Sequence, residues 1–255
     1  LNDNPPANAI DWRGNAWDIS KYDKANKAAT AGAHPNSRFT ALAKNCPCIS
    51  KEFDNPAGVP ISAIVFGGRR AKTAPLVYQS FNWQHGAFVG SIMASETTAA
   101  AAGAVGVVRR DPMAMRPFVG YNMGDYFQHW LDMGKKIPNA PKIFNVNWFR
   151  TDDEGNFIWP GFGDNMRILM WILARCRGEV EANETAIGYL PNACDIDIEG
   201  LEGIDLATIE GLLSVDKDLW LEDCTGVQEL YDQIGERVPA ELRAQLAALR
   251  DRLSK

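Results

Sequence analysis

Hydrophobic and polar residues alternate in short blocks along most of the chain, and the blocks predict both strands and helices. The apolar run at residues 60–66 predicts a buried strand that ends at two glycines, and residues 75–78 and 105–108 predict further strands. Residues 141–149 predict another, followed by a turn at 151–156 and a returning hairpin strand at 157–159. Residues 1–35 are polar and turn-rich, so we expect loop and short strand there.

Helical spacing appears at residues 83–94, which lead into an alanine-rich stretch at 99–102, and at residues 125–133. The second helix would place Tyr126, Trp130 and Met133 on one face. Asp164 or Asn165 can cap a third helix that stops at Gly178. Its predicted apolar side consists of Met166, Leu169, Met170 and Leu173.

From about Asp205 the sequence predicts a helical tail over residues 205–255, with Pro239 near the first turn of the last helix. One face of that helix is a stripe of Leu242, Leu246, Leu249 and Leu253. We interpret the stripe as packing surface rather than as a partner site. Strands and helices are mixed throughout, so the pattern predicts an α/β fold with a helical C-terminus.

Composition narrows the function classes. The 255 residues suit one large domain or two small ones, and a net charge of −6 lacks the basic field expected of a nucleic-acid-binding protein. Five cysteines, an odd number at irregular spacing, favour a reducing cytoplasm over a disulfide framework. The sequence contains no run of about 20 apolar residues, so it predicts no membrane-spanning helix. The start lacks a signal region and an initiator Met, so we expect a processed, cut or truncated chain.

Two motifs carry arginines that can bind anions. In Pro-Asn-Ser-Arg-Phe at residues 35–39, Arg38 offers a planar fork for carboxylate or phosphate, and Asn36 and Ser37 add neutral donors. The alternative is a turn with a solvated arginine. In Phe-Gly-Gly-Arg-Arg at residues 66–70, the glycines let backbone approach a ligand, while Arg69 and Arg70 can neutralise phosphate charge. The alternative there is a tight turn with exposed arginines.

Residues 95–104, Ser-Glu-Thr-Thr-Ala-Ala-Ala-Ala-Gly-Ala, contain small side chains that would let a segment pack closely, open and close. An active-site lid uses that property. The alternative is the end of an alanine-rich helix, since alanine has the highest helix propensity.

An aromatic cluster is the most specific motif. It begins at Asn147 and runs through Phe149, Phe157 and Phe162 to Asn165. Aromatic faces can sandwich a flat base, and an asparagine amide can read a base edge. Core packing is the alternative for any single aromatic residue. A GxxxxGK(S/T) phosphate loop does not occur in the sequence, and neither does a GxGxxG or HExxH motif.

Taken together and in this order, the motifs resemble those of the GTP-dependent phosphoenolpyruvate carboxykinases, from about Trp12 to the end of the chain. The matching stretches are residues 34–39, 66–70, 83–86, 110–118 and 149–165. The resemblance implies a mixed-sheet nucleotide-binding C-terminal lobe, of which residues 1–255 form a part. It also implies the conversion of oxaloacetate and GTP to phosphoenolpyruvate, GDP and carbon dioxide in gluconeogenesis or anaplerosis.

The resemblance also implies residue roles. Asn36, Ser37 and Arg38 would bind phosphoenolpyruvate or oxaloacetate, with Arg38 as the catalytic residue facing the transferred phosphoryl group. Nucleotide binding would involve Arg38, Arg69, Phe149, Phe157, Phe162, Gly163, Asp164 and Asn165. Residues 97–107 correspond to a mobile lid, and the residues assigned to it are Glu96, Thr97, Thr98, Ala99, Ala100, Ala101, Ala102 and Gly103.

In this family the phosphate loop, the Mn²⁺ and Mg²⁺ ligands and the amino-terminal domain lie upstream of anything matched, so we expect none of them in this chain. The chain alone should therefore be inactive, and should pack as a cytoplasmic monomer against the missing part. Two other hypotheses stay open: a non-catalytic guanine-nucleotide-binding module, and a purely structural or interaction fragment. The alanine- and glycine-rich centre of the lid departs from relatives that carry charges there, so its closing equilibrium could differ.

Overall fold

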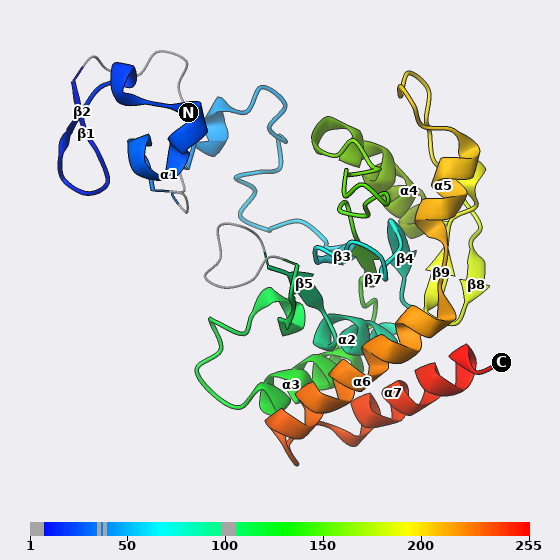
Figure 1. Ribbon diagram of the computed structural model, residues 1–255. Coiled ribbons are helices and arrows are strands. Elements are labelled where there is room, and N and C mark those ends of the chain that lie inside the picture. The colour runs from blue at the N-terminus through cyan, green and yellow to red at the C-terminus, as the bar shows by residue number, and fades with distance from the viewer. Residues whose placement is uncertain (1–7, 35–36, 38–39, 98–105) are drawn as a thin grey trace. The chain divides into compact units, whose positions relative to one another are not determined.

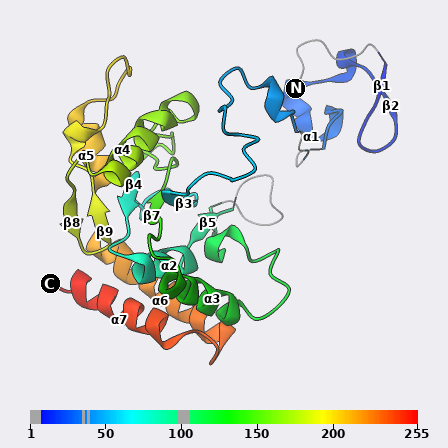
Figure 2. The same ribbon diagram turned by 180° about the vertical axis from the view of Figure 1, so that it is seen from behind.

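The computed structural model describes residues 8–34, 37, 40–97 and 106–255, and the chain divides into two compact units (Figures 1 and 2). The smaller unit contains Leu1–Val59 with Ala99–Ala102, and the larger contains Pro60–Thr98 with Gly103–Lys255. Each unit has its own packing and is described by itself.

The smaller unit is built from turns and short elements around Trp17. Strand β1 (Ala9–Ile10) pairs antiparallel with β2 (Ala16–Trp17), and α1 (Lys27–Thr30) follows. Single 3-10 turns lie at Ile19–Lys21, Lys24–Asn26 and Ala43–Asn45. The Trp17 indole N–H donates to the Thr30 carbonyl at 2.8 Å, and a Cβ on Gly32 would lie 2.8 Å from the indole ring. The prediction of loop and short strand is confirmed, whereas α1 was not predicted.

A five-stranded mixed sheet forms the centre of the larger unit. Its order is β3 (Ala63–Gly67), β7 (Lys142–Val146), β4 (Val77–Gln79), β9 (Gly188–Leu190) and β8 (Asn183–Thr185). Strands β3 and β7 are parallel and the other pairs are antiparallel. The predicted α/β class with a mixed sheet is confirmed. The predicted burial of the first strand is wrong, because β3 lies at the sheet edge and only Phe66 in it is buried.

Helices cover opposite faces of this sheet because successive strand residues point to opposite sides. On one face, α2 (Trp83–Ser91) approaches β7 so closely that a Cβ on Gly86 would lie 2.4 Å from Ile143 Cδ1. On the other, α4 (Asn165–Arg177) places the Trp171 ring 6.0 Å from that of Phe144. Helix α2 ends earlier than predicted, and Ala94–Glu96 instead forms strand β5, paired antiparallel with β6 (Val108–Arg110).

The ends of α4 are as predicted, but its buried face is not. Asp164 lies at the N-cap, and Gly178 terminates the helix at φ 73°. The predicted apolar residues Met166, Met170 and Leu173 are exposed, whereas Ile168, Trp171 and Ile172 are buried. Apolar residues occupy two arcs of this helix, and the sheet contacts the arc that carries the large indole.

The remaining helices are α3 (Met123–Lys136), α5 (Leu206–Leu213), α6 (Lys217–Ile234) and α7 (Ala240–Leu253). Figures 1 and 2 show α6 and α7 running side by side, and the predicted leucine stripe of α7 is buried. The helical tail is thus confirmed. Helix α3 buries Phe127 and Leu131, while the predicted Tyr126 and Trp130 are only half-buried at the border of that face.

Two hairpin regions also differ from the sequence patterns. Instead of a returning strand at residues 157–159, a single antiparallel bridge joins Thr151 to Phe157. Strand β6 begins at Val108, later than the pattern suggested. In the part of the chain that the structure describes, no helix is long and apolar enough to cross a membrane.

His85 is a buried histidine whose contacts require the neutral ring. Its Nδ1 accepts the Phe81 backbone N–H at 3.1 Å, and its ring stacks on Phe81 at 4.5 Å. Burial, and secondarily the charge of Arg252, lowers the pKa of His85 from 6.5 to about 3. Protonation would also turn Nδ1 from an acceptor into a donor.

We therefore predict acid destabilisation through His85. The unfolded chain binds a proton near pH 6.5 and the folded chain only near pH 3, so stability is complete above pH 6.5 and falls as the pH drops through this window. His85 should contribute up to about 1.4 kcal/mol per pH unit to the slope of the free energy of unfolding against pH. Denaturant titrations between pH 6.5 and 5.5 measure the free energy of unfolding as a function of pH. Its slope should be smaller for His85→Asn, whose amide oxygen can still accept the Phe81 N–H but does not titrate. The exposed His129→Asn should match the parent chain; equal slopes for all three would contradict the assignment.

Candidate functional site

The two units contain different parts of the predicted site. Asn36 and Arg38 lie outside the described residues, while Ser37 is exposed and its backbone N–H donates to the His34 carbonyl at 2.9 Å. Of the predicted lid, Glu96 and Thr97 are described, and residues 98–103 lie outside the described ranges. The nucleotide residues from Arg69 onward all belong to the larger unit.

The loop after β3 lies directly against β5. A Cβ on Gly68 would be 2.2 Å from the Ala94 carbonyl oxygen, so glycine is required for this approach. The Arg69 backbone N–H donates to Ser95 Oγ at 3.1 Å, and the Glu96 backbone N–H donates to the Arg69 carbonyl at 2.8 Å. Gly68 therefore lets the arginine loop lie against β5, the strand that leads into residues 98–105.

Arg69 has most of its guanidinium donors available for a ligand. Its guanidinium carbon lies 4.6 Å from the centre of the Phe149 ring, a cation–π geometry. Among the described residues its side chain makes one hydrogen bond, to the Glu96 carbonyl at 3.5 Å. A cavity of about 310 Å³ adjoins it, lined by Gly67, Gly68, Arg69, Ser95, Val146, Trp148 and Phe149. Such an arrangement can bind a phosphate next to a planar group.

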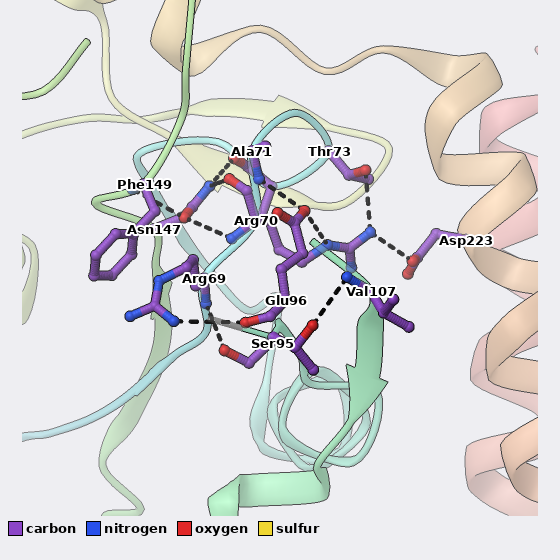
Figure 3. Close-up of polar contacts among 12 residues, drawn as sticks. Arg69, Arg70, Ala71, Thr73, Ser95, Glu96, Val107, Asn147, Phe149 and Asp223 are labelled. Atoms are coloured by element: carbon purple, nitrogen blue, oxygen red, sulfur yellow. Dashed lines mark hydrogen bonds and ion pairs between the residues drawn. The ribbon is translucent and has the colours of Figure 1, made fainter. Parts of the chain in front are cut away.

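The Arg70 side chain is mostly buried and is held within the protein through its Nη2 group, which differs from the interpretation of a tight turn with exposed arginines. Its side chain is 11% exposed, and its Nη2 donates to Thr73 Oγ1 at 3.1 Å and to Asp223 Oδ1 at 2.9 Å (Figure 3). Glu96 Oε1 lies 4.0 Å from its Nε. Arg70 is thus not an exposed turn residue.

Asn147 has a structural role that occupies both ends of its amide. Its Nδ2 donates to the carbonyls of Arg70 and Ala74, each at 2.8 Å, and its Oδ1 accepts the backbone N–H groups of Arg70 and Phe149 at 3.2 Å (Figure 3). The side chain is buried. Asn147 therefore ties the arginine loop to the segment that carries Phe149.

Of the three phenylalanines, Phe157 and Phe162 lie on the surface and Phe149 is half-buried. The Phe149 and Phe157 rings meet edge to face at 5.6 Å, and Phe157 is 61% exposed. Phe162 is 99% exposed and has φ 42°, a left-handed conformation that a bulky residue rarely adopts. Core packing is thus contradicted for Phe157 and Phe162. Exposed aromatic faces and local backbone strain are features of binding sites.

Residues 163–165 follow Phe162 into α4. A Cβ on Gly163 would meet nothing within 4 Å. Asp164 Oδ1 accepts from Arg167 Nε at 3.1 Å, while Asn165 Oδ1 accepts from the buried Trp159 indole at 2.8 Å. Asn165 uses its acceptor to hold Trp159, so the Nδ2 group is the part of its amide left for a ligand.

Asp223 and Arg110, neither of them predicted as a site residue, complete the surroundings of Arg70. Asp223 is buried on α6, and Arg110 of β6 donates to both of its carboxylate oxygens at 2.8–3.0 Å. A larger cavity of about 930 Å³ adjoins this pair, with Arg70, Glu96 and Arg116 in its lining. A signal was present: Asp223 follows Trp220 by three residues and precedes Val227 by four, which places a charge in an apolar stripe.

The electrostatics around the Asp223 pair extend to Tyr78. Burial raises the pKa of the Tyr78 hydroxyl, and the Asp223 charge shifts it further in the same direction. The hydroxyl is therefore protonated at neutral pH. Within the described ranges, no group of three or more His, Cys, Asp or Glu residues is placed to hold a metal ion.

A mixed α/β domain in which Arg69 and Phe149 line a cavity, with the exposed rings of Phe157 and Phe162 further along the same segment, is suited to a planar, phosphorylated ligand. The sequence matches the phosphoenolpyruvate carboxykinase C-terminal P-loop domain over residues 1–252. The chain belongs to the GTP-dependent phosphoenolpyruvate carboxykinase family.

Named relatives agree with this assignment. The phosphoenolpyruvate carboxykinase (GTP) of Anaeromyxobacter dehalogenans strain 2CP-C is 52% identical over 248 residues, and that of Chlamydia caviae is 46% identical over 248 residues. These alignments cover 97% and 96% of this chain respectively. The chain spans 40% of the length of each of these curated relatives.

We predict that Gly68→Ala displaces the arginine loop from β5, because the new methyl group meets a backbone oxygen rather than a flexible side chain. The free energy of unfolding should fall by about 1–3 kcal/mol, the usual cost of overpacking. Urea denaturation measures it. Gly163→Ala, which meets nothing within 4 Å, should change stability by less than about 0.5 kcal/mol. Equal stability of both variants would show that the loop does not lie against β5.

Proposed function

We propose that this chain supplies part of the nucleotide and substrate site of an enzyme that converts oxaloacetate and GTP to phosphoenolpyruvate, GDP and carbon dioxide. The observation that carries the proposal is the stacking of Arg69 on Phe149 beside a cavity, with Phe157 and Phe162 exposed nearby in the sequence. Family membership and relatives that bear this activity in their names support it.

In this proposal the nucleotide spans the arginine loop and the aromatic segment. Arg69 donates to the phosphates with the guanidinium N–H groups that make no hydrogen bond to the described residues. Phe149, Phe157 and Phe162 present ring faces or edges to the guanine, and stacking is worth roughly 1–3 kcal/mol per base. Gly163, Asp164 and Asn165 contact the base edge, with the Asn165 Nδ2 group as donor. Arg38 also faces the phosphates.

The substrate role falls to Asn36, Ser37 and Arg38. Decarboxylation of oxaloacetate breaks a carbon–carbon bond and leaves its electron pair in an enolate, whose oxygen then takes the phosphoryl group from GTP. Both species are anionic, so positioned arginine side chains lower the barrier by charge stabilisation. Arg38 would supply that charge at the reacting centre.

A lid over residues 97–107 would exclude water and stray protons from the enolate. The described base of this segment supports the proposal, because Thr97 and Val107 are joined by two hydrogen bonds, at 2.9 and 3.1 Å. The hairpin β5–β6 below them provides a firm attachment for a segment that opens and closes.

The family resemblance implies that Mn²⁺ and Mg²⁺ serve the complete enzyme, where divalent cations neutralise phosphate and enolate charge. Among the described residues, no group of three or more His, Cys, Asp or Glu side chains converges to hold a metal ion. We therefore assign no metal ligand and no step through a metal to this chain. We further propose a cytoplasmic, monomeric enzyme in which this chain packs against additional sequence.

A non-catalytic guanine-nucleotide-binding module is the second candidate. The exposed, strained Phe162 would serve either protein, because both would hold a guanine. Turnover distinguishes the carboxykinase from the non-catalytic module, because only the carboxykinase also needs Arg38 and the lid.

Phe162→Ala should weaken GDP binding, because the exposed ring would lose its stacking on the base. We expect about a tenfold higher Kd by calorimetry in the natural polypeptide that carries this chain. Phe118→Ala is the matched control, because Phe118 is also exposed, at 76%. An unchanged GDP affinity in Phe162→Ala would refute the base-stacking role and favour a structural fragment.

A polypeptide limited to residues 1–255 should show no carboxykinase turnover with GTP and Mn²⁺, because neither a phosphate-loop motif nor a described metal site is present in it. The assay compares it with the natural polypeptide under the same conditions. Turnover near that of the natural polypeptide would sink this prediction. Micromolar GDP binding by residues 1–255 without turnover would favour the module.

A further inference from the structure

We propose that Asp223 is a positioning residue for Arg69, acting through Arg70, and that it couples the arginine loop to the base of the β5–β6 hairpin. This inference rests on the proposed role of Arg69 in nucleotide binding. Asp223 would not contact the nucleotide itself. It would hold the Arg70 side chain, and Arg70 would in turn fix the position of Arg69.

Asp223 directs its contacts away from its own helix. Its side chain is 6% exposed, and it accepts from Arg70 Nη2 at 2.9 Å and from Arg110 Nη1 and Nη2 at 3.0 and 2.8 Å. The Asp223 backbone carbonyl accepts a further bond from Arg110 Nη2 at 2.9 Å. Arg70 comes from the loop after β3 and Arg110 from β6, so one carboxylate joins three separate segments.

The charges in this cluster balance only as a group. Arg70 and Arg110, 11% and 13% exposed, contribute two positive charges, and Asp223 contributes one negative charge. Glu96 of β5 supplies the second negative charge, 4.0 Å from Arg70 Nε (Figure 3). Buried charges are tolerated when they are paired and hydrogen-bonded. Loss of Asp223 would leave two guanidinium groups facing each other with a single counter-charge.

Helix α6 is shaped to receive Arg110. Gly226 lies in the interior of the helix, where glycine is less stable than alanine. A Cβ at that position would be 2.7 Å from Arg110 Nη2. Gly226 lowers the intrinsic stability of the helix, but it leaves space for the Arg110 guanidinium to lie against α6 and reach Asp223. A solvated surface pair would not need this space.

The position of Arg70 is transmitted to Arg69 through the backbone. Asn147 holds the Arg70 backbone at both its N–H and its carbonyl, while Asp223 and Thr73 hold the side chain. The Arg69 carbonyl, one peptide away, accepts the Glu96 N–H, and the Glu96 carboxylate accepts the Ala71 N–H at 2.9 Å. Release of the Arg70 side chain would therefore loosen the pairing that sets the orientation of Arg69.

The first test measures GDP affinity by calorimetry in the natural polypeptide that carries this chain. Arg69→Gln and Asp223→Asn should each raise the Kd about tenfold, the size expected for losing a charged hydrogen bond. The double variant should bind no more weakly than Arg69→Gln alone, because both changes act on one interaction. Arg70→Gln keeps the Asp223–Arg110 ion pair and leaves the excess negative charge on Glu96, whose side chain is 18% exposed. This variant should therefore fold, and it should show the same loss of GDP affinity even if Asp223→Asn does not fold.

Val227→Ala is the matched structural control. Val227 is buried on the same helix, so the change should lower stability, yet GDP affinity should stay within about twofold because no arginine is released. Equal weakening by Val227→Ala would reduce Asp223 to a stability role and overturn the inference.

Hydrogen exchange provides a readout that does not depend on nucleotide. Asp223→Asn should speed exchange at the amides of Ala71 and Glu96 by about tenfold or more relative to Val227→Ala. If Arg69→Gln leaves the Kd unchanged, the proposed role of Arg69 fails and the inference fails with it. If Arg69→Gln weakens binding while Asp223→Asn or Arg70→Gln does not, the inference alone is overturned.

Discussion

Two guanidinium groups and two carboxylates meet between the sheet, the β5–β6 hairpin and α6, and the arrangement of the arginine loop depends on their balance. Asp223 and Glu96 offset the charges of Arg70 and Arg110 in a nearly buried place where no single member would be stable unpaired. Charge neutrality therefore fixes where three segments that are distant in sequence must lie. Packing by apolar residues alone would allow these segments to slide, whereas directional hydrogen bonds do not.

This constraint divides two neighbouring arginines into different tasks. Arg70 Nη2 donates to Thr73 and Asp223 inside the protein, whereas the Arg69 guanidinium lies on Phe149 and makes one hydrogen bond among the described residues. Two adjacent identical residues thus have different surroundings: Arg70 is an internal anchor, and Arg69 is the residue proposed to bind the nucleotide. The same division appears among the aromatics, because Trp159 is buried and held by Asn165 while Phe162 is almost fully exposed on a strained backbone. Rigid neighbours support each exposed group, as binding sites require.

Much of the fold could be predicted from the sequence, because it rests on local patterns. Strand β3, the helices α3, α4 and α7, the Gly178 stop and the leucine stripe all follow from periodicity and capping. The errors came where tertiary contacts choose between local options. Helix α4 has two apolar arcs and only the sheet selects one, and β3 looked buried although it has a single strand neighbour. The periodicity of a single sequence does not say which other element packs against a given helix or strand.

For the candidate site, the sequence by itself determined the residue types: an arginine loop behind two glycines, three phenylalanines and the order of motifs that marks the carboxykinase family. The residue types alone did not distinguish Arg69 from Arg70, or Asn165 from Asn147; the family resemblance singled out Arg69 and Asn165. Only the tertiary structure shows that Arg70 and Asn147 are held by internal hydrogen bonds, because their partners include Asp223, which lies more than 150 residues further along the chain. Hydrogen-bond saturation is a property of the folded chain, since its partners come from segments that folding brings together.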